Sequence, residues 1–109
     1  MAEYSLEVLA SKIEFDVEDY IPLIELFIDT TDSNLSDISA AVKISDKESI
    51  SVNIHNIKGA AMNLGLEAFT VLLGHMSKLN KAGSFADIEE VVLKCMFELN
   101  QIREVLEKS

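Results

Sequence analysis

The stretch ISVNIHNIKGAAMNLG, residues 50–65, contains the pattern that decides the fold class. Its apolar side chains recur at spacings of four and three, which is the period of one face of an α-helix. These side chains belong to Ile50, Ile54, Ile57, Ala61 and Leu64. We expect this face to be buried and the helix to end near Leu64. Gly65 follows at the position where a left-handed residue commonly terminates a helix.

Similar apolar stripes lie on both sides of this segment. The predicted helices, in chain order, span about residues 5–13, 18–42, 46–64, 67–81 and 85–106. The second helix is expected to start near Glu18 or Asp19, because a proline such as Pro22 is best tolerated in the first turn. Gly83 is expected to end the fourth helix.

Polar side chains mark the predicted starts of the third and fifth helices. Ser45 and Glu48 have the spacing of a capping box, and Asp46 is a rival N-cap for the same helix. Ser84, with Asp87 three residues later, is expected to cap the fifth helix. These assignments leave only short connections between most of the helices.

The fold class follows from these stripes and connections. Short connections make consecutive helices antiparallel, and a helix with one apolar stripe must bury it against other helices. We therefore predict an all-α protein, an antiparallel up-down four-helix bundle with an additional short N-terminal helix, in which residues 1–109 form a single domain. One proline and four glycines provide too few turns for an all-β fold.

Charge and composition exclude several functional classes. The formal net charge is −10, which disfavours binding to nucleic acid and to anionic membrane surfaces. No apolar run approaches the ~20 residues that a membrane span requires, and no secretory signal opens the chain. The single cysteine, Cys95, falls in the apolar seam of the fifth helix and cannot form an internal disulfide, so a cytoplasmic location is expected.

His55 is the candidate functional residue. At about 100° per residue it lies roughly 140° from the centre of the apolar stripe, so its side chain should face solvent. Lys58 and Gly59 are its neighbours at i+3 and i+4, and a glycine costs roughly 1 kcal/mol relative to alanine inside a helix. Four further residues lie on the same side, namely Glu48, Ser51, Val52 and Met62.

This combination favours a docking site around a reactive imidazole over an ordinary surface histidine. The lysine adds a positive charge to an acidic chain, the glycine removes a side chain, and Val52 and Met62 add apolar surface. A neutral imidazole is a nucleophile at physiological pH. His75 lies near the edge of the fourth stripe without a following Lys-Gly pair, so we interpret it as a boundary residue. The two histidines lack Glu-x-x-His spacing, so no metal site is predicted.

The segment HNIKGAAMNLG, residues 55–65, resembles the signature of histidine-containing phosphotransfer domains, in which the histidine is followed by Lys-Gly and then by Leu-Gly. The resemblance extends over nearly the whole chain, because that family also folds as a four-helix bundle with an extra N-terminal helix. It implies that His55 is phosphorylated on its exposed ring nitrogen, that Lys58 offsets the phosphoryl charge, and that Gly59 gives access to the partner's loop.

The resemblance also implies positions on the next helix. Ser77 occupies a position near the phosphorylation site where glutamine or glutamate is commoner in the family, and Lys81 matches a position that is frequently basic. Ser77 thus departs from the family pattern at a residue that would contact the imidazole or the phosphate.

The implied function is that of a phosphorelay intermediate without a nucleotide site or kinase activity of its own. His55 would exchange a phosphoryl group with the aspartate of response-regulator receiver domains, and the receiver would supply Mg²⁺, so no cofactor is expected on this chain. Two alternatives keep the fold. The chain could be the phosphorylatable domain of a larger sensor or chemotaxis-type histidine kinase, or a non-catalytic helical adaptor whose His55 is never modified.

Overall fold

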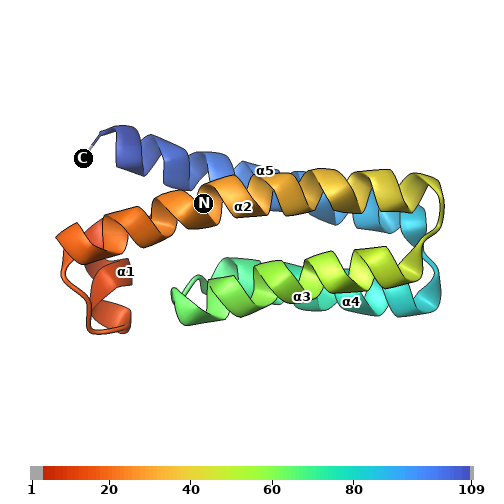
Figure 1. Ribbon diagram of the computed structural model, residues 1–109, viewed down its shortest axis with the longest axis horizontal. Coiled ribbons are helices and arrows are strands. Elements are labelled where there is room, and N and C mark those ends of the chain that lie inside the picture. The colour runs from red at the N-terminus through yellow and green to blue at the C-terminus, as the bar shows by residue number, and fades with distance from the viewer. Residues whose placement is uncertain (1–3, 109) are drawn as a thin grey trace.

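The structure is a computed structural model that describes residues 4–108, and it contains five α-helices joined by short turns (Figure 1). Within the described residues there is no β-strand. The helices are α1 (Leu6–Lys12), α2 (Val17–Lys43), α3 (Lys47–Asn63), α4 (Glu67–Ala82) and α5 (Phe85–Glu107).

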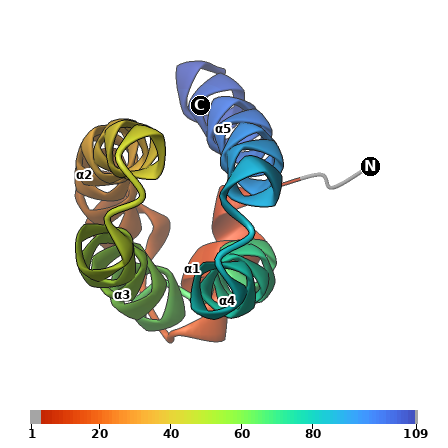
Figure 2. The ribbon, with the colours of Figure 1, turned by 90° about the vertical axis from the view of Figure 1, so that its right-hand side faces the viewer.

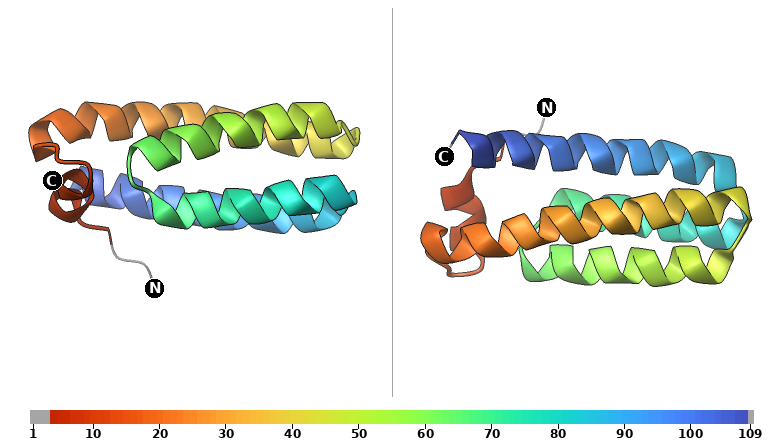
Figure 3. Two further views of the ribbon diagram at one scale, coloured as in Figure 1. Left: turned by 90° about the horizontal axis from the view of Figure 1, so that it is seen from below. Right: turned by 45° about the horizontal axis from the view of Figure 1, so that its top comes forward.

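Helices α2 to α5 form an antiparallel bundle in which each helix packs against its two neighbours in the order α2, α3, α4, α5 and back to α2. Viewed along the bundle, the four helices occupy the corners of a square (Figure 2). The short helix α1 lies at the end of the bundle where α2 begins and packs against α2 (Figure 3). The predicted fold class is therefore confirmed.

The predicted stripes form one continuous core. The five residues that define the stripe in residues 50–65, four of α3 and Leu64 directly after it, are all buried, and the stripes of α2, α4 and α5 are buried or partly buried. Phe27 of α2 and Phe69 of α4 meet edge to face across the bundle, with ring centroids 5.1 Å apart and an interplanar angle of 80°. This core fixes which side of each helix faces solvent.

The helix ends confirm some predicted caps and correct others. Gly65 and Gly83 adopt φ values of +73° and +74°, as expected for residues that end helices. At the start of α3 the Asp46 side chain accepts a hydrogen bond from the Ser49 amide at 3.1 Å, so Asp46 is the N-cap. The capping box predicted for Ser45 is wrong, because Ser45 itself has a left-handed φ of +53° within the turn.

The predicted Ser84 cap is also incomplete. Ser84 occupies the N-cap position of α5, but its side chain makes no capping hydrogen bond. Its backbone carbonyl instead accepts the amides of Asp87, at 3.2 Å, and Ile88, at 3.3 Å. The helix therefore starts at the predicted place through its backbone.

The start of α2 differs from the prediction. The helix begins at Val17, so Pro22 lies in the second turn instead of the first. Pro22 is exposed, and it has no amide to donate to the carbonyl of Glu18. Tyr20 explains why the helix starts one or two residues earlier than predicted, since its side chain is fully buried and its hydroxyl donates to the Leu64 carbonyl at 2.8 Å. Burial also raises the pKa of Tyr20 to about 12.

Candidate functional site

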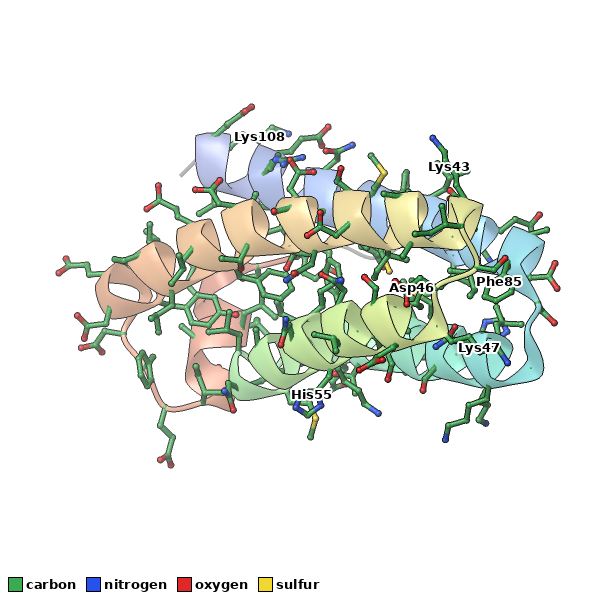
Figure 4. The ribbon with its side chains drawn as sticks, turned by 45° about the vertical axis from the view of Figure 1, so that its right-hand side comes forward. Lys43, Asp46, Lys47, His55, Phe85 and Lys108 are labelled. Atoms are coloured by element: carbon green, nitrogen blue, oxygen red, sulfur yellow. The ribbon has the colours of Figure 1, made fainter. Side chains whose placement is uncertain are left out.

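His55 lies midway along α3, and its side chain is exposed. Figure 4 shows it pointing away from the bundle. The preceding Ile54 is only 4 % exposed and Ile57 only 1 %, so the buried face lies on the opposite side of the helix. The orientation predicted from the helical period is confirmed.

The imidazole of His55 has no partner among the described residues 4–108, since neither ring nitrogen forms a hydrogen bond or an ion pair there. Lys58, one turn later, is partly exposed and also has no ion pair within that range. A nucleophilic ring and a cation therefore share one surface without being bound to each other or to a carboxylate. Both remain available for an external anionic group.

The surface around His55 has the mixed character that the sequence indicates. Val52 is 54 % exposed and Met62 is 61 % exposed, while Ser51 is an exposed polar residue. Exposed apolar side chains at this density beside a polar ring suit contact with another protein.

Gly59 leaves open space on this surface. Apart from its chain neighbours and the nearby backbone of α3, a Cβ atom at this position would meet no atom of residues 4–108 within 4 Å. The φ of Gly59 is also not positive. Neither the packing nor the backbone conformation of the protein therefore requires glycine here, although glycine weakens the helix.

The positions of Ser77 and Lys81 follow from the register of α3 against α4. The Lys47 carbonyl accepts a hydrogen bond from the Asn80 amide group at 3.0 Å, and Lys47 Nζ donates to the Lys81 carbonyl at 3.4 Å. Lys81 therefore lies beside the start of α3, at about 12 Å of helix length from His55. Ser77 is partly exposed one turn closer to His55, and it makes no hydrogen bond with the imidazole.

The other candidates are separate from this site. His75 is exposed, so it is a surface residue more than the boundary residue that the sequence suggested. Cys95 is fully buried, and its burial, together with the nearby Glu98, raises its pKa to about 12. No group of three or more metal-ligating side chains occurs in the described part of the chain.

Two surface features escaped the sequence interpretation. A groove of about 610 Å³ between α4 and α5 is mostly apolar, and Val71, Leu93 and Phe97 in its lining are at least 60 % exposed. Leu93 and Phe97 are four residues apart and lie outside the predicted apolar seam of α5. This second pair of apolar residues was the feature of the sequence that could have indicated the groove. The groove lies on the far side of α4 from α3.

Charge is also distributed unevenly. Residues 16–43, which include α2, carry seven acidic side chains and one lysine, whereas residues 46–83, which include α3 and α4, carry three acidic side chains and four lysines. The negative charge is therefore concentrated on α2, which borders α3 on one side, whereas α3 and α4 together carry nearly balanced charge. An anionic group at the α3–α4 pair would meet less repulsion there than the net charge of −10 suggests.

Comparison with protein families gives a match to the Hpt domain over residues 22–108, from the second turn of α2 to the end of α5. Searches of curated proteins and of solved structures give no significant match. None of the helices in residues 4–108 is long and apolar enough to cross a membrane.

Proposed function

The chain belongs to the Hpt domain family, whose members act in histidine phosphotransfer in two-component signalling, and we propose that His55 is the residue that carries the phosphoryl group. In this proposal the protein is a phosphorelay intermediate. His55 accepts a phosphoryl group from the aspartyl phosphate of one response-regulator receiver domain and passes it to the aspartate of another.

The observation that carries the proposal is the exposed imidazole of His55, which has no bonding partner among residues 4–108, beside a lysine without an ion pair in that range and an open glycine. A lone pair on an exposed ring nitrogen attacks phosphorus, and a P–N bond forms. The P–O bond to the aspartate breaks, and its electron pair stays on the departing carboxylate. The ring then carries a proton on its other nitrogen, which it can release to water. Transfer to the next receiver reverses these steps.

The partner supplies most of the electrostatic stabilisation in this scheme. Hpt domains are phosphoryl carriers without a catalytic site for nucleotide. We propose that no cofactor resides on this chain and that Mg²⁺ bound to the receiver neutralises the transferring group. Lys58 adds a positive charge from the carrier side, and Ser51, Val52 and Met62 provide contact surface for the receiver. A cytoplasmic location is part of the same proposal, because receiver domains act there.

Phosphotransfer from a panel of phosphorylated receiver domains tests this function directly. We expect at least one receiver to lose its phosphoryl group to this protein, which then carries an acid-labile, base-stable label. A second, unphosphorylated receiver should subsequently remove the label. If no receiver in a broad panel labels the protein, the carrier function is rejected in favour of an unmodified helical adaptor or of a domain that only a kinase phosphorylates.

Lys58→Ala should slow this transfer without changing stability. Loss of a charge-assisted interaction with a phosphoryl group costs about 1.5–3 kcal/mol, which corresponds to a rate reduction of roughly tenfold or more. The defect should shrink as salt screens the site. Single-turnover transfer at low and high ionic strength measures it, and Lys78→Ala, at an exposed lysine of the neighbouring helix α4, is the control. Equal rates for Lys58→Ala and wild type at low salt would remove Lys58 from the mechanism.

A further inference from the structure

The four glycines of this chain divide into two pairs. Gly65 and Gly83 end helices with positive φ, so the backbone requires them. Gly59 and Gly74 lie inside α3 and α4, and neither has a positive φ. A Cβ atom at either position would meet nothing within 4 Å. Both glycines weaken their helices, and neither the packing nor the backbone of this protein accounts for them.

Gly74 lies level with His55 in the α3–α4 pair. At one end of the pair the Asn80 side chain donates to the Lys47 carbonyl, and at the other end residues 64–66 join the two helices. Both helices rise 1.5 Å per residue. Eight residues inward from either end of the pair, α3 has reached His55 or its neighbour and α4 has reached the segment 72–75. His55 and this segment therefore lie at the same height along the pair.

Gly74 also lies on the side of α4 that borders α3. It precedes Ser77 by three residues and Lys81 by seven, so the three share one side of the helix. The Lys81 carbonyl accepts a hydrogen bond from Lys47 of α3, so this end of α4 lies beside the start of α3. Ala68 and Leu72, on the other flank of α4, line the groove against α5, so the flank that carries Ser77 borders α3. Gly74 itself is partly exposed.

We infer that Gly74 is a further positioning residue for phosphotransfer, which keeps the α4 side of His55 bare so that the receiver backbone can approach the phosphorylated ring. This inference rests on the proposed function. Gly59 leaves the surface of α3 free of a side chain one turn after His55. Gly74 does the same on the neighbouring helix α4. The imidazole, which has no partner among residues 4–108, lies at the same level of the pair as Gly74, and a side chain at position 74 would occupy open space on the α4 side of that level.

A side chain at position 74 should affect the docking of the receiver but not the reactivity of the His55 ring. A side chain at position 74 adds no contact within the protein, so it should not impair folding or the chemistry of the imidazole. It should obstruct only a donor or acceptor that is large enough to cover both helices. A small donor such as phosphoramidate, which phosphorylates imidazole and releases ammonia, should reach His55 equally well in wild type and variant.

The experiment compares Gly74→Gln with wild type in two reactions on the intact protein. With phosphoramidate, the labelling rates should agree within about twofold. With a receiver domain that exchanges with wild type, transfer should slow by about tenfold, as expected when an added side chain must be accommodated in a packed contact. Gly74→Ala should raise the melting temperature by about 4 °C, because alanine stabilises the helix interior.

Leu93→Gln is the matched control, since it places the same side chain on the exposed surface of α5, in the groove on the far side of α4 from α3, and it should exchange with the receiver at the wild-type rate. Gly59→Gln provides the reference for a blocked site. If wild type exchanges and Gly74→Gln exchanges equally fast, the role of Gly74 is wrong while the proposed function stands. If Gly74→Gln loses phosphoramidate labelling as well, or if wild type exchanges with no receiver, the inference is likewise rejected.

Discussion

His55→Gln is expected to lose phosphoryl acceptance completely while unfolding at nearly the temperature of the wild-type protein. The side chain is exposed and forms no hydrogen bond or ion pair with the described residues, so its replacement removes no stabilising contact. Surface substitutions of this kind usually change the free energy of unfolding by less than about 0.5 kcal/mol. Glutamine keeps a polar side chain of similar size and is a better helix former, but it offers no imidazole lone pair.

Two measurements on the same sample test this expectation. Incubation with a phosphorylated receiver domain reports acid-labile label, and thermal unfolding monitored by circular dichroism reports stability. His75→Gln is the matched control, because it replaces the other histidine, also exposed, on the neighbouring helix. Label that persists in His55→Gln, or that disappears in His75→Gln alone, would assign the phosphoryl group to a different residue.

Ile57→Ala is expected to destabilise the protein by about 2–5 kcal/mol, as large-to-small core substitutions do. Ile57 is 1 % exposed and lies on the core side of the same helix that presents His55. Removing its branched side chain leaves a cavity among the side chains of a core shared by four helices. The loss is large relative to the 5–15 kcal/mol of stability typical of such domains, so the midpoint of urea unfolding should fall clearly.

Val52→Ala is the control for this prediction, because Val52 is 54 % exposed on the same helix and its truncation should change stability by less than about 0.5 kcal/mol. At temperatures where Ile57→Ala remains folded, it should still accept phosphate on His55. A cost of Ile57→Ala no larger than that of Val52→Ala would show that the core face of α3 is misplaced. The outward direction of His55 would then lose its support.

Much of this architecture could be predicted because the information is local. The spacing of Ile50, Ile54 and Ile57 selects both a helix and its buried face, and the exposed direction of His55 follows from the same period. The left-handed conformations of Gly65 and Gly83 follow from glycine's freedom at positive φ. The roles of His55, Lys58 and Gly59 in phosphotransfer stay predictions until the transfer experiments are done.

The errors occurred where several local choices were nearly equal in energy. Ser45 and Asp46 were both competent caps, and the tight turn placed Ser45 at positive φ and left Asp46 to bind the Ser49 amide. Pro22 should favour a helix start within one turn, yet α2 begins earlier. The buried Tyr20, whose hydroxyl donates to the Leu64 carbonyl at the end of α3, stabilises this earlier start. A contact spanning 44 residues cannot be seen in a local pattern.

The helices, their buried faces, the outward direction of His55 and the Hpt signature beside it could be read from the chain alone, because they depend on the helical period and on the preferences of single residues. What lies across from His55 depends on how the helices pack. The register of α3 against α4, set by a short turn and by the Asn80–Lys47 hydrogen bond, brings Gly74 level with the imidazole and places Lys81 farther away. Which side chains of two helices stand level depends on this packing, and neither helix encodes it alone.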